Sequence, residues 1–309
     1  MSKLADFIGN RQIVDGLARG LACGHIFHAY VFAGVAGIGK TMLARVFARA
    51  VLCVDLQING GLADACGVCK SCRAFDAGNH PDLVFVTTDK ASIGVDNIRE
   101  QINAGLVIAP YGQRRVYIID NADTMTPQAQ NALLKTLEEG NSFAMFLLAA
   151  RNSELFLPTV LSRCIINKLR PLADEVVADY LIKAGHGADA AKAAAKASQG
   201  SIGVALALID DEGYADFHRE ILDIAGKVDG MNVIDAFAAA RYLDANKVRV
   251  AQVLDIFTLY YRDLLVGGAQ ASRPALDRLE AVDKARRYLN SNTNFLLTME
   301  VMMLEMARI

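Results

Sequence analysis

Short apolar runs alternate with amphipathic stretches between residues 27 and 169. Five of these runs predict β-strands, at residues 29–33, 83–87, 115–120, 144–149 and 165–169. All but the last are almost continuously apolar, which is typical of strands that are buried on both faces of a parallel sheet. Strands that alternate with amphipathic helices predict an α/β domain with a parallel sheet.

Two of the amphipathic stretches predict long helices within this domain. Residues 40–53 carry one apolar stripe, made of Leu43, Val46, Phe47 and Ala50. A second helix, with Leu133 and Leu137 on its apolar face, is predicted to begin at Thr126-Pro127, because threonine caps helix N-termini and proline is tolerated in the first turn. Both helices therefore have one face suited to packing against the sheet.

The pattern changes after Pro171, where no further strand is indicated. Residues 174–184, 188–199 and 201–209 predict three short helices. From about residue 213 the chain is helical by composition, with breaks at residues 226–232, 267–274 and 290–294. We therefore predict three domains: an α/β domain at 1–170, a small helical domain at 171–212 and a helical C-terminal domain at 213–309.

Composition narrows the class of protein. With 32 Lys and Arg against 34 Asp and Glu the net charge is −2, which excludes a coat protein that binds nucleic acid through charge alone. Hydrophobic residues reach 53%, but charges interrupt every apolar stretch before the roughly 18 residues that a membrane span needs. The N-terminus lacks the apolar core of a secretion signal. We expect a cytosolic protein without membrane contact, whose cysteines stay reduced.

A phosphate-binding loop is indicated directly after the first strand. Residues 34–41 match G-x-x-x-x-G-K-[ST] through Gly34, Gly39, Lys40 and Thr41, with an additional Gly37. Glycines allow backbone amides to point at phosphate oxygens at the start of a helix. Lys40 would reach the β- and γ-phosphates, and Thr41 would place its hydroxyl on Mg²⁺. The alternative is a glycine-rich turn from strand to helix that happens to contain a lysine.

A second acidic element is needed to hold the metal of such a site. The apolar strand at residues 115–120 ends in Asp120, the form of a Walker B segment whose carboxylate orients Mg²⁺ and its waters. Many buried strands end in an aspartate, so the prediction depends on the phosphate-binding loop about 80 residues earlier. ATP or ADP with Mg²⁺ is the expected ligand.

Four of the six cysteines have the spacing of a metal site. Cys66, Cys69 and Cys72 follow one another with two residues between them, and Cys53 lies upstream at the predicted end of a helix. Four thiolates close a tetrahedral Zn²⁺ site and leave no position for water, so the knuckle at 53–72 would be structural. The alternative is a surface insert with free thiols. Cys23 lacks such partners and is expected to be a small core residue.

Together these features resemble the AAA+ clamp-loader subunits of bacterial DNA polymerase III. Beyond the phosphate-binding loop and the four cysteines, the similarity rests on short segments at residues 7–10, 28–30, 79–82, 96–99, 131–139 and 161–164. It is dense over about 170 residues and thin in the helical region. The resemblance implies an AAA+ domain, a helical lid at 171–212 and a C-terminal oligomerisation collar at 213–309.

By the same resemblance, Arg163 would be an arginine finger. It would reach the ATP site of a neighbouring protomer and stabilise charge on the transferring phosphate in trans. Guanidinium suits this role because it is permanently charged and forked. The alternative is an arginine in an ordinary surface ion pair.

Three positions depart from the pattern of subunits that hydrolyse ATP. Where active relatives carry a water-polarising glutamate this chain has Asn121, and the lid arginine is replaced by Gly203. The first sensor position falls on Ala150 or Arg151, of which Ala150 is the better match. These losses resemble the delta-prime type of subunit more than the gamma or tau type. We expect the chain to bind nucleotide with little or no turnover.

The implied partners are gamma/tau-type and delta-type subunits in a hetero-oligomer, the sliding clamp and primed DNA. Direct DNA contact is open, because the helix at 126–139 offers only Gln128, Gln130 and Lys135 on its expected polar side. Two other functions remain as alternatives. One is a self-sufficient AAA+ motor of gamma/tau or remodelling type, and the other is a zinc-dependent nucleic-acid reader, for which only Lys70 and Arg73 are basic nearby.

Overall fold

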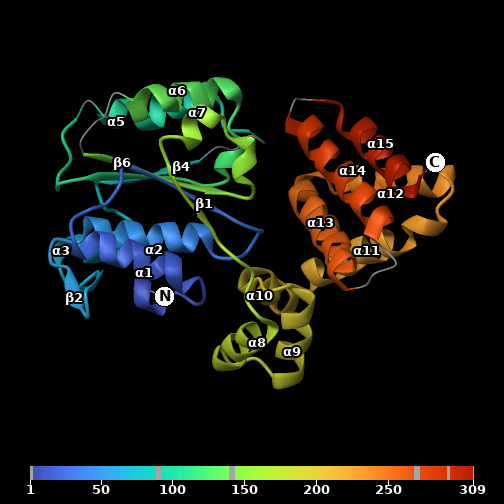
Figure 1. Cartoon of the computed structure of the whole chain (residues 1–309), viewed down its shortest axis with the longest axis horizontal. Helices are drawn as coiled ribbons and strands as arrows, with labels where there is room; N and C mark the ends of the chain where they lie inside the picture. The colour runs from blue at the N-terminus through green and yellow to red at the C-terminus, as the bar shows by residue number, and fades with distance from the viewer. Residues whose placement is uncertain are drawn as a thin grey trace. The chain divides into compact units, whose positions relative to one another are not determined.

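The structure is a computed structural model that describes residues 3–87, 92–106, 108–138, 143–267, 272–290 and 293–308. The chain forms two compact units, Met1–Leu172 and Ala173–Ile309. The first contains every strand found in the described residues, and the second is helical (Figure 1). This arrangement confirms the α/β class with a following helical region. The further division of the helical region into a lid and a collar stays a prediction.

A five-stranded parallel sheet forms the centre of the first unit. Its strands lie in the order β4-β5-β6-β1-β7. They span Leu83–Val86 (β4), Arg115–Ile119 (β5), Ala144–Ala150 (β6), Ala29–Ala33 (β1) and Ile165–Lys168 (β7). All five predicted strands are confirmed to within one residue at each end. The three inner strands are buried throughout, whereas the edge strands β4 and β7 are partly exposed.

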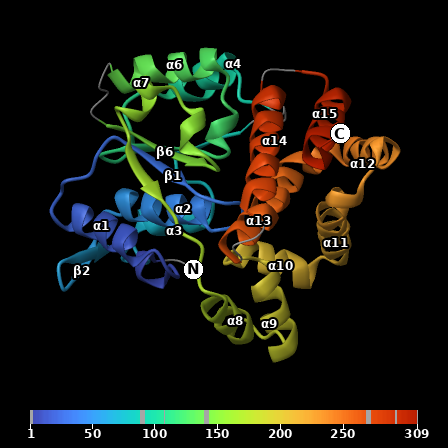
Figure 2. The same ribbon diagram turned by 45° about the vertical axis from the view of Figure 1, so that its right-hand side comes forward.

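Helices cover both faces of the sheet, as Figures 1 and 2 show. One face packs on α1 (Arg11–Ala22) and α2 (Lys40–Leu52), and the other on α6 (Pro127–Glu138) and α7 (Pro158–Leu161). Alternation along the strands explains the two cores, since Phe32 faces the first pair of helices while Val31 faces the second. The predicted stripe on α2 is buried, and Thr126 caps α6 by accepting the N–H of Ala129 at 3.2 Å.

The insert between α2 and β4 contains elements that the hydrophobic pattern did not indicate. A short antiparallel hairpin joins β2 (Gln57–Asn59) to β3 (Leu62–Asp64), and α3 (Lys70–Asp76) follows. Gly60 and Gly61 at the turn both have positive φ, 58° and 78°, as a two-residue hairpin turn requires. Strands of three residues are too short to show a period in the sequence. Between β4 and β5 lie the short helices α4 (Val95–Ile98) and α5 (Ala104–Leu106).

The second unit begins with three short helices and continues with five longer ones. The first three are α8 (Asp174–Lys183), α9 (Ala188–Ala197) and α10 (Ile202–Asp210). The others are α11 (Glu212–Lys227), α12 (Val233–Ala245), α13 (Val250–Gly267), α14 (Ser272–Asn290) and α15 (Phe295–Ala307), which share one core rich in alanine, methionine and aromatic side chains. The predicted break at 267–274 is too long, because α14 begins at Ser272 and takes Pro274 into its first turn, where its missing N–H costs little.

No helix in the described parts of the chain is long and apolar enough to cross a membrane. Another expectation is wrong: Cys23 is exposed. It follows the last residue of α1, whose buried stripe is Val14, Leu17, Ala18 and Leu21. Cys23 falls beyond that stripe, so a small apolar side chain there meets solvent.

Candidate nucleotide and metal sites

The predicted phosphate-binding loop joins β1 to α2. Gly37 and Gly39 have left-handed φ values of 69° and 96°, and Gly39 is the N-cap of α2. A Cβ atom on Gly39 would lie 3.2 Å from the ring of Phe7, so glycine fits both the backbone and the space. The loop thus ends where the N–H groups of the first helical turn lack intrahelical partners, which is suitable for a phosphate.

Three predicted site residues from two elements meet at this loop. The Lys40 ammonium donates to the carbonyl oxygens of Gly34 and Val35, each at 2.9 Å. The Thr41 hydroxyl donates to Oδ1 of Asp120 at 2.8 Å, which joins the start of α2 to the end of β5. A hydroxyl and a carboxylate held together in this way are hard oxygen ligands that fit Mg²⁺. Their roles toward a nucleotide stay predictions.

The position after Asp120 has a special backbone. Asn121 adopts the left-handed conformation, with φ 47° and ψ 42°, and its N–H donates to Oδ1 of Asp120 at 2.9 Å. Asparagine is among the few residues that tolerate this conformation. Its amide side chain is not a base, so it cannot take a proton from water. Ala150, the match that we predict for the first sensor position, is buried, and its carbonyl oxygen accepts the N–H of Gly34 at 3.2 Å.

A further acid lies in the same turn. Asp123 belongs to the 3₁₀ turn Ala122–Thr124 after β5 and is only 8% exposed. Its Oδ1 has no hydrogen-bond partner. Burial raises the pKa of this carboxyl, and the backbone N–H of Arg151 and the charges of Arg151 and Lys40 oppose that increase. In the sequence Asp123 follows Asp120 in the run Asn121-Ala122-Asp123, which supports the Walker B interpretation but indicates no separate role for this acid.

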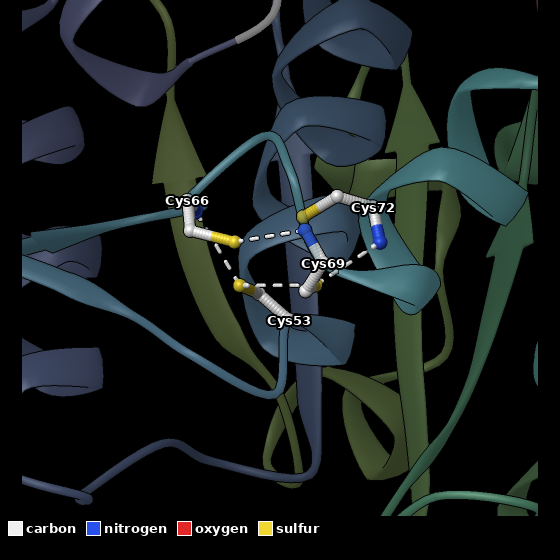
Figure 3. A group of neighbouring side chains, drawn as sticks. All are labelled: Cys53, Cys66, Cys69 and Cys72. Atoms are coloured by element: carbon white, nitrogen blue, oxygen red, sulfur yellow. Dashed lines mark hydrogen bonds between the residues drawn. The ribbon is translucent and has the colours of Figure 1, made fainter.

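The four predicted metal ligands come together (Figure 3). Cys53 is the C-cap of α2, Cys69 is the N-cap of α3, and all four sulfur atoms lie within 4.8 Å of one another. In a tetrahedral site with Zn–S bonds of about 2.3 Å, neighbouring sulfurs are about 3.8 Å apart. Sγ of Cys53 and Sγ of Cys69 are 3.9 Å apart. The sulfurs therefore fit a zinc ion.

Backbone donors already face these sulfurs. The N–H groups of Cys66, Cys69 and Cys72 point at Sγ of Cys53, Cys66 and Cys69, at 3.4, 3.3 and 3.4 Å. For Cys69, burial alone would raise the pKa, but the backbone N–H donors of Cys72 and Val54, together with hydrogen bonds to the thiols of Cys72 and Cys66, lower the pKa to about 6. Burial raises the pKa of Cys72. A cation is what allows several thiolates to share so small a volume.

The cysteine insert is anchored to the sheet through Ser71 and His80. The Ser71 hydroxyl donates to the carbonyl oxygen of Leu52 at 2.5 Å and lies 2.8 Å from Nε2 of His80. Nδ1 of His80 accepts the N–H of Asp82 at 3.1 Å. With its hydroxyl proton used on Leu52, Ser71 is the acceptor for Nε2–H, which fixes the neutral tautomer of the imidazole. Burial lowers the pKa of His80, which agrees with a neutral ring.

Asp82 holds the segment that leads into β5. Its fully buried carboxylate accepts the N–H groups of Tyr111 and Gly112, at 2.9 and 2.7 Å, and pairs with Arg115 at 3.3 Å. Arg115 is itself buried and also donates to the carbonyl oxygens of Gly105 and Ile108. The segment 79–82 entered the sequence analysis only as part of a resemblance. Its physical role is to fix the entry of the strand that ends at Asp120.

Arg163 follows α7 and is partly exposed. Its guanidinium pairs with Glu138 at 2.9 Å, with the two side chains 37% and 46% exposed, and it also donates to the carbonyl oxygen of Thr159 at 2.9 Å. It therefore lies at the surface of its unit, as an arginine that acts on another chain must. Glu139, the last residue of the 131–139 segment, lies outside the described residues.

One expectation about α6 is wrong. Gln130 is not on the polar side of this helix but is buried. Its amide nitrogen donates to the carbonyl oxygens of Met125 and Leu155, each at 3.2 Å, and its amide oxygen accepts the N–H of Leu157 at 2.7 Å. A glutamine can face the core here because both ends of its amide are paired. Gln130 thereby holds the segment just before α7.

The part of the chain that contains the phosphate-binding loop and the four cysteines is similar to known subunits of DNA polymerase III. Residues 9–173, more than half of the chain, match the family described as "DNA polymerase III, delta subunit". The chain is 36% identical over 213 residues to DNA polymerase III subunit tau/gamma of Haemophilus influenzae, a match that covers 67% of this chain and 30% of that protein.

Two further relatives are delta' subunits of DNA polymerase III. That of Pseudomonas aeruginosa is 39% identical over 140 residues, which is 45% of this chain and 42% of the relative. That of Bacillus subtilis is 35% identical over 156 residues, 50% of this chain and 46% of the relative. The chain thus spans less than half the length of the curated relatives it matches. A solved DNA polymerase III gamma subunit-related protein of Thermotoga maritima aligns at TM-score 0.43 and 16% identity, over 95% of this chain and 99% of that one.

Proposed function

From the chain's membership of the DNA polymerase III delta-subunit family, we propose that it is a delta-prime-type clamp-loader subunit. It would support ATP hydrolysis by a neighbouring subunit and hydrolyse little ATP itself. Its three domains would be an AAA+ domain at 1–170, a lid at 171–212 and a collar at 213–309. The collar would join it to gamma/tau-type and delta-type subunits in a hetero-oligomer that loads the sliding clamp onto primed DNA.

The observation that carries this proposal is the contrast between Asn121 and Arg163. Asn121 follows the Walker B acid Asp120 but has no group that can accept a proton from the attacking water. Arg163 is available at the surface, in an ion pair between two partly exposed side chains that is cheap to open. A chain with this combination is better suited to completing a neighbouring ATP site than to hydrolysing ATP at its own.

Arg163 would act in trans through charge. Its guanidinium would leave Glu138 and pair with the oxygens of the neighbour's triphosphate, where negative charge is spread in the transition state. A planar cation with several N–H donors can contact two oxygens at once. The ordinary surface ion pair with Glu138 is thus the resting state of the finger in the separate chain.

The chain's own loop would bind ATP or ADP with Mg²⁺. The glycine backbone and the N–H groups at the start of α2 would hold the phosphates, and Thr41 and Asp120 would hold the metal ion. Lys40, which now donates to two loop carbonyl oxygens, would turn to the phosphates. With alanine at the first sensor position and Gly203 in the lid, the contacts that drive hydrolysis are reduced.

Cys53, Cys66, Cys69 and Cys72 would hold a structural zinc ion. The four sulfurs lie within 4.8 Å of one another, and four thiolates would fill the tetrahedral coordination of zinc, so no coordination position would be left for a substrate. The knuckle begins at the C-cap of α2, a helix of 13 residues and so about 20 Å long, whereas the phosphate-binding loop lies at its N-cap. That separation supports a structural role rather than a part in the chemistry.

A steady-state ATPase assay on the purified chain tests this function. We expect turnover well below about 1 s⁻¹, the lower end of the ordinary enzyme range. Turnover at or above that rate, abolished by Lys40→Ala, would favour the alternative of a gamma/tau-like motor. Lys40→Ala is the matched control because it assigns any turnover to this chain's own loop.

A further inference from the structure

Asp123 is a buried acid that the proposed function does not use. It lies three residues after Asp120, in the 3₁₀ turn Ala122–Thr124 that follows β5. The turn is held by its own backbone, since the N–H of Thr124 bonds to Asn121 and the N–H of Met125 bonds to Ala122. The backbone of the turn and one hydrogen bond to the carboxylate, from the N–H of Arg151, thus hold Asp123 in place.

One oxygen of this carboxylate lacks a hydrogen-bond partner. The backbone N–H of Arg151 donates to the side chain, but Oδ1 accepts no hydrogen bond although it is buried. Buried polar atoms are satisfied in the great majority of native proteins, and an exception in a protein is often completed by water or an ion. The charge of Lys40 acts on Asp123, so the acid lies within electrostatic reach of the loop where phosphates would bind.

The residues around Asp123 offer few other acceptors for a metal-bound water. Oδ1 of Asp120 already accepts hydrogen bonds from the hydroxyl of Thr41 and from the N–H of Asn121. Asn121 offers an amide in place of the usual second carboxylate, and Ala150 offers no side-chain polar group. Among the acids of residues 120–123, Asp123 is thus the one with an unused buried acceptor. Hydrated Mg²⁺ is bound in proteins through one or two carboxylates and keeps several waters, which are strong donors.

We propose that Oδ1 of Asp123 accepts a hydrogen bond from a metal-bound water of the Mg²⁺–nucleotide complex, and so serves as the second carboxylate of this site. The inference rests on the proposed binding of nucleotide at residues 34–41. Asp123 adds affinity that depends on the metal ion, and it leaves metal-free nucleotide binding to the loop and Lys40. It also accounts for the retention of a charged group in a buried place that would favour a neutral one.

The test compares nucleotide affinity with and without the metal. Binding of a fluorescent ADP analogue to the full chain is measured in MgCl₂ and in EDTA, and the ratio of the two dissociation constants gives the enhancement by Mg²⁺. We expect Asp123→Asn to reduce this enhancement by about tenfold or more, because a hydrogen bond to a charged acceptor is lost. Affinity in EDTA should stay unchanged. Glu154→Gln, which removes an exposed carboxylate near Arg151 in the sequence, should leave both values as in the wild type.

Stability of the nucleotide-free chain is the second measurement. Because Asp123→Asn removes a buried charge and keeps an acceptor for the N–H of Arg151, its thermal midpoint should equal or exceed that of the wild type. Asp123→Ser, measured in the same way, gives a second neutral side chain in case the amide disturbs the turn. An unchanged Mg²⁺ enhancement in these variants, or a lower midpoint as the sole effect, would overturn the inference and make Asp123 a structural residue.

The outcomes separate this inference from the function on which it rests. If the wild type binds ADP only as weakly as Lys40→Ala, with no effect of Mg²⁺, nucleotide binding by the chain is wrong and the inference falls with it. If the wild type shows the Mg²⁺ enhancement and Asp123→Asn retains it, the inference alone is wrong.

Discussion

Replacing Asp82 with asparagine should destabilise the first unit more than any surface change. The substitution keeps the shape of the side chain and one acceptor oxygen, and it removes the charge. In the wild type the carboxylate accepts N–H groups from Tyr111 and Gly112 and pairs with Arg115. The variant leaves the buried guanidinium of Arg115 without its counter-charge.

The contacts set the size of this effect. Removing one partner of a buried ion pair typically costs about 3–5 kcal/mol, because the other charge stays buried and uncompensated. Arg115 keeps other acceptors, among them the carbonyl oxygen of Ile108 at 3.0 Å, and asparagine can still accept one backbone N–H. We therefore expect a loss near the lower end, about 3 kcal/mol in the free energy of unfolding of the first unit.

Urea unfolding followed by circular dichroism measures this loss. Asp55→Asn is the matched control, because it removes an exposed carboxylate from the same unit and should change the free energy by less than about 0.5 kcal/mol. Since Asp82 fixes the entry of β5, the variant should also weaken nucleotide binding at Asp120, at the other end of that strand. A loss below about 1 kcal/mol for Asp82→Asn would refute the claim that its carboxylate neutralises Arg115.

Three further predictions concern cysteine and histidine side chains. Atomic absorption should find about one zinc ion per wild-type chain, and Cys72→Ser should remove this ion and lower the thermal midpoint. Cys23→Ser, at an exposed cysteine outside the cluster, should change neither the zinc content nor the midpoint. A full zinc content in the Cys72→Ser variant would contradict the site. Burial raises the pKa of Cys164 to about 12, so at pH 8 iodoacetamide should alkylate it far more slowly than the exposed Cys23, and equal rates would show that Cys164 is accessible. Burial lowers the pKa of His218 below its ordinary 6.5, so the unfolded chain takes up a proton that the folded chain does not, and stability should fall as pH drops through 6.5. His218→Gln should reduce this pH dependence of the thermal midpoint without abolishing it, because burial also lowers the pKa of His28 and of His80. An unchanged slope would mean that His218 does not contribute to it.

Patterned features of the fold could be predicted from the sequence. The strands at β1, β5 and β6 are buried on both faces, so their apolar runs were continuous, and the stripe of α2 repeated at helical spacing. The cysteine cluster could be found for a similar reason, because close spacing in the chain already brings three of its sulfurs together. Thr41 and Asp120 were paired through the known order of their two motifs, and the structure brings them to 2.8 Å.

Contacts between residues far apart in the chain could not be predicted in this way. Asp82 and Arg115 are 33 positions apart, and neither belongs to a motif with a chemical meaning of its own. Gln130 was misplaced because a glutamine on a helix is usually solvated, and its three backbone partners come from two separate turns. Cys23 was misplaced because burial of a small apolar residue depends on where its helix ends.

Arg163→Ala tests the central claim most directly, in a complex assembled with gamma/tau-type and delta-type subunits. The separate chain should lose less than about 1 kcal/mol of stability, because its ion pair with Glu138 is solvent-exposed. We predict that ATP turnover at the neighbouring site that receives the finger falls by about a thousandfold, so that its share of the complex's ATPase is lost, while this chain's affinity for ADP is unchanged. An assembled complex that keeps its full ATPase with Arg163→Ala would contradict the account, and so would loss of turnover confined to the isolated chain.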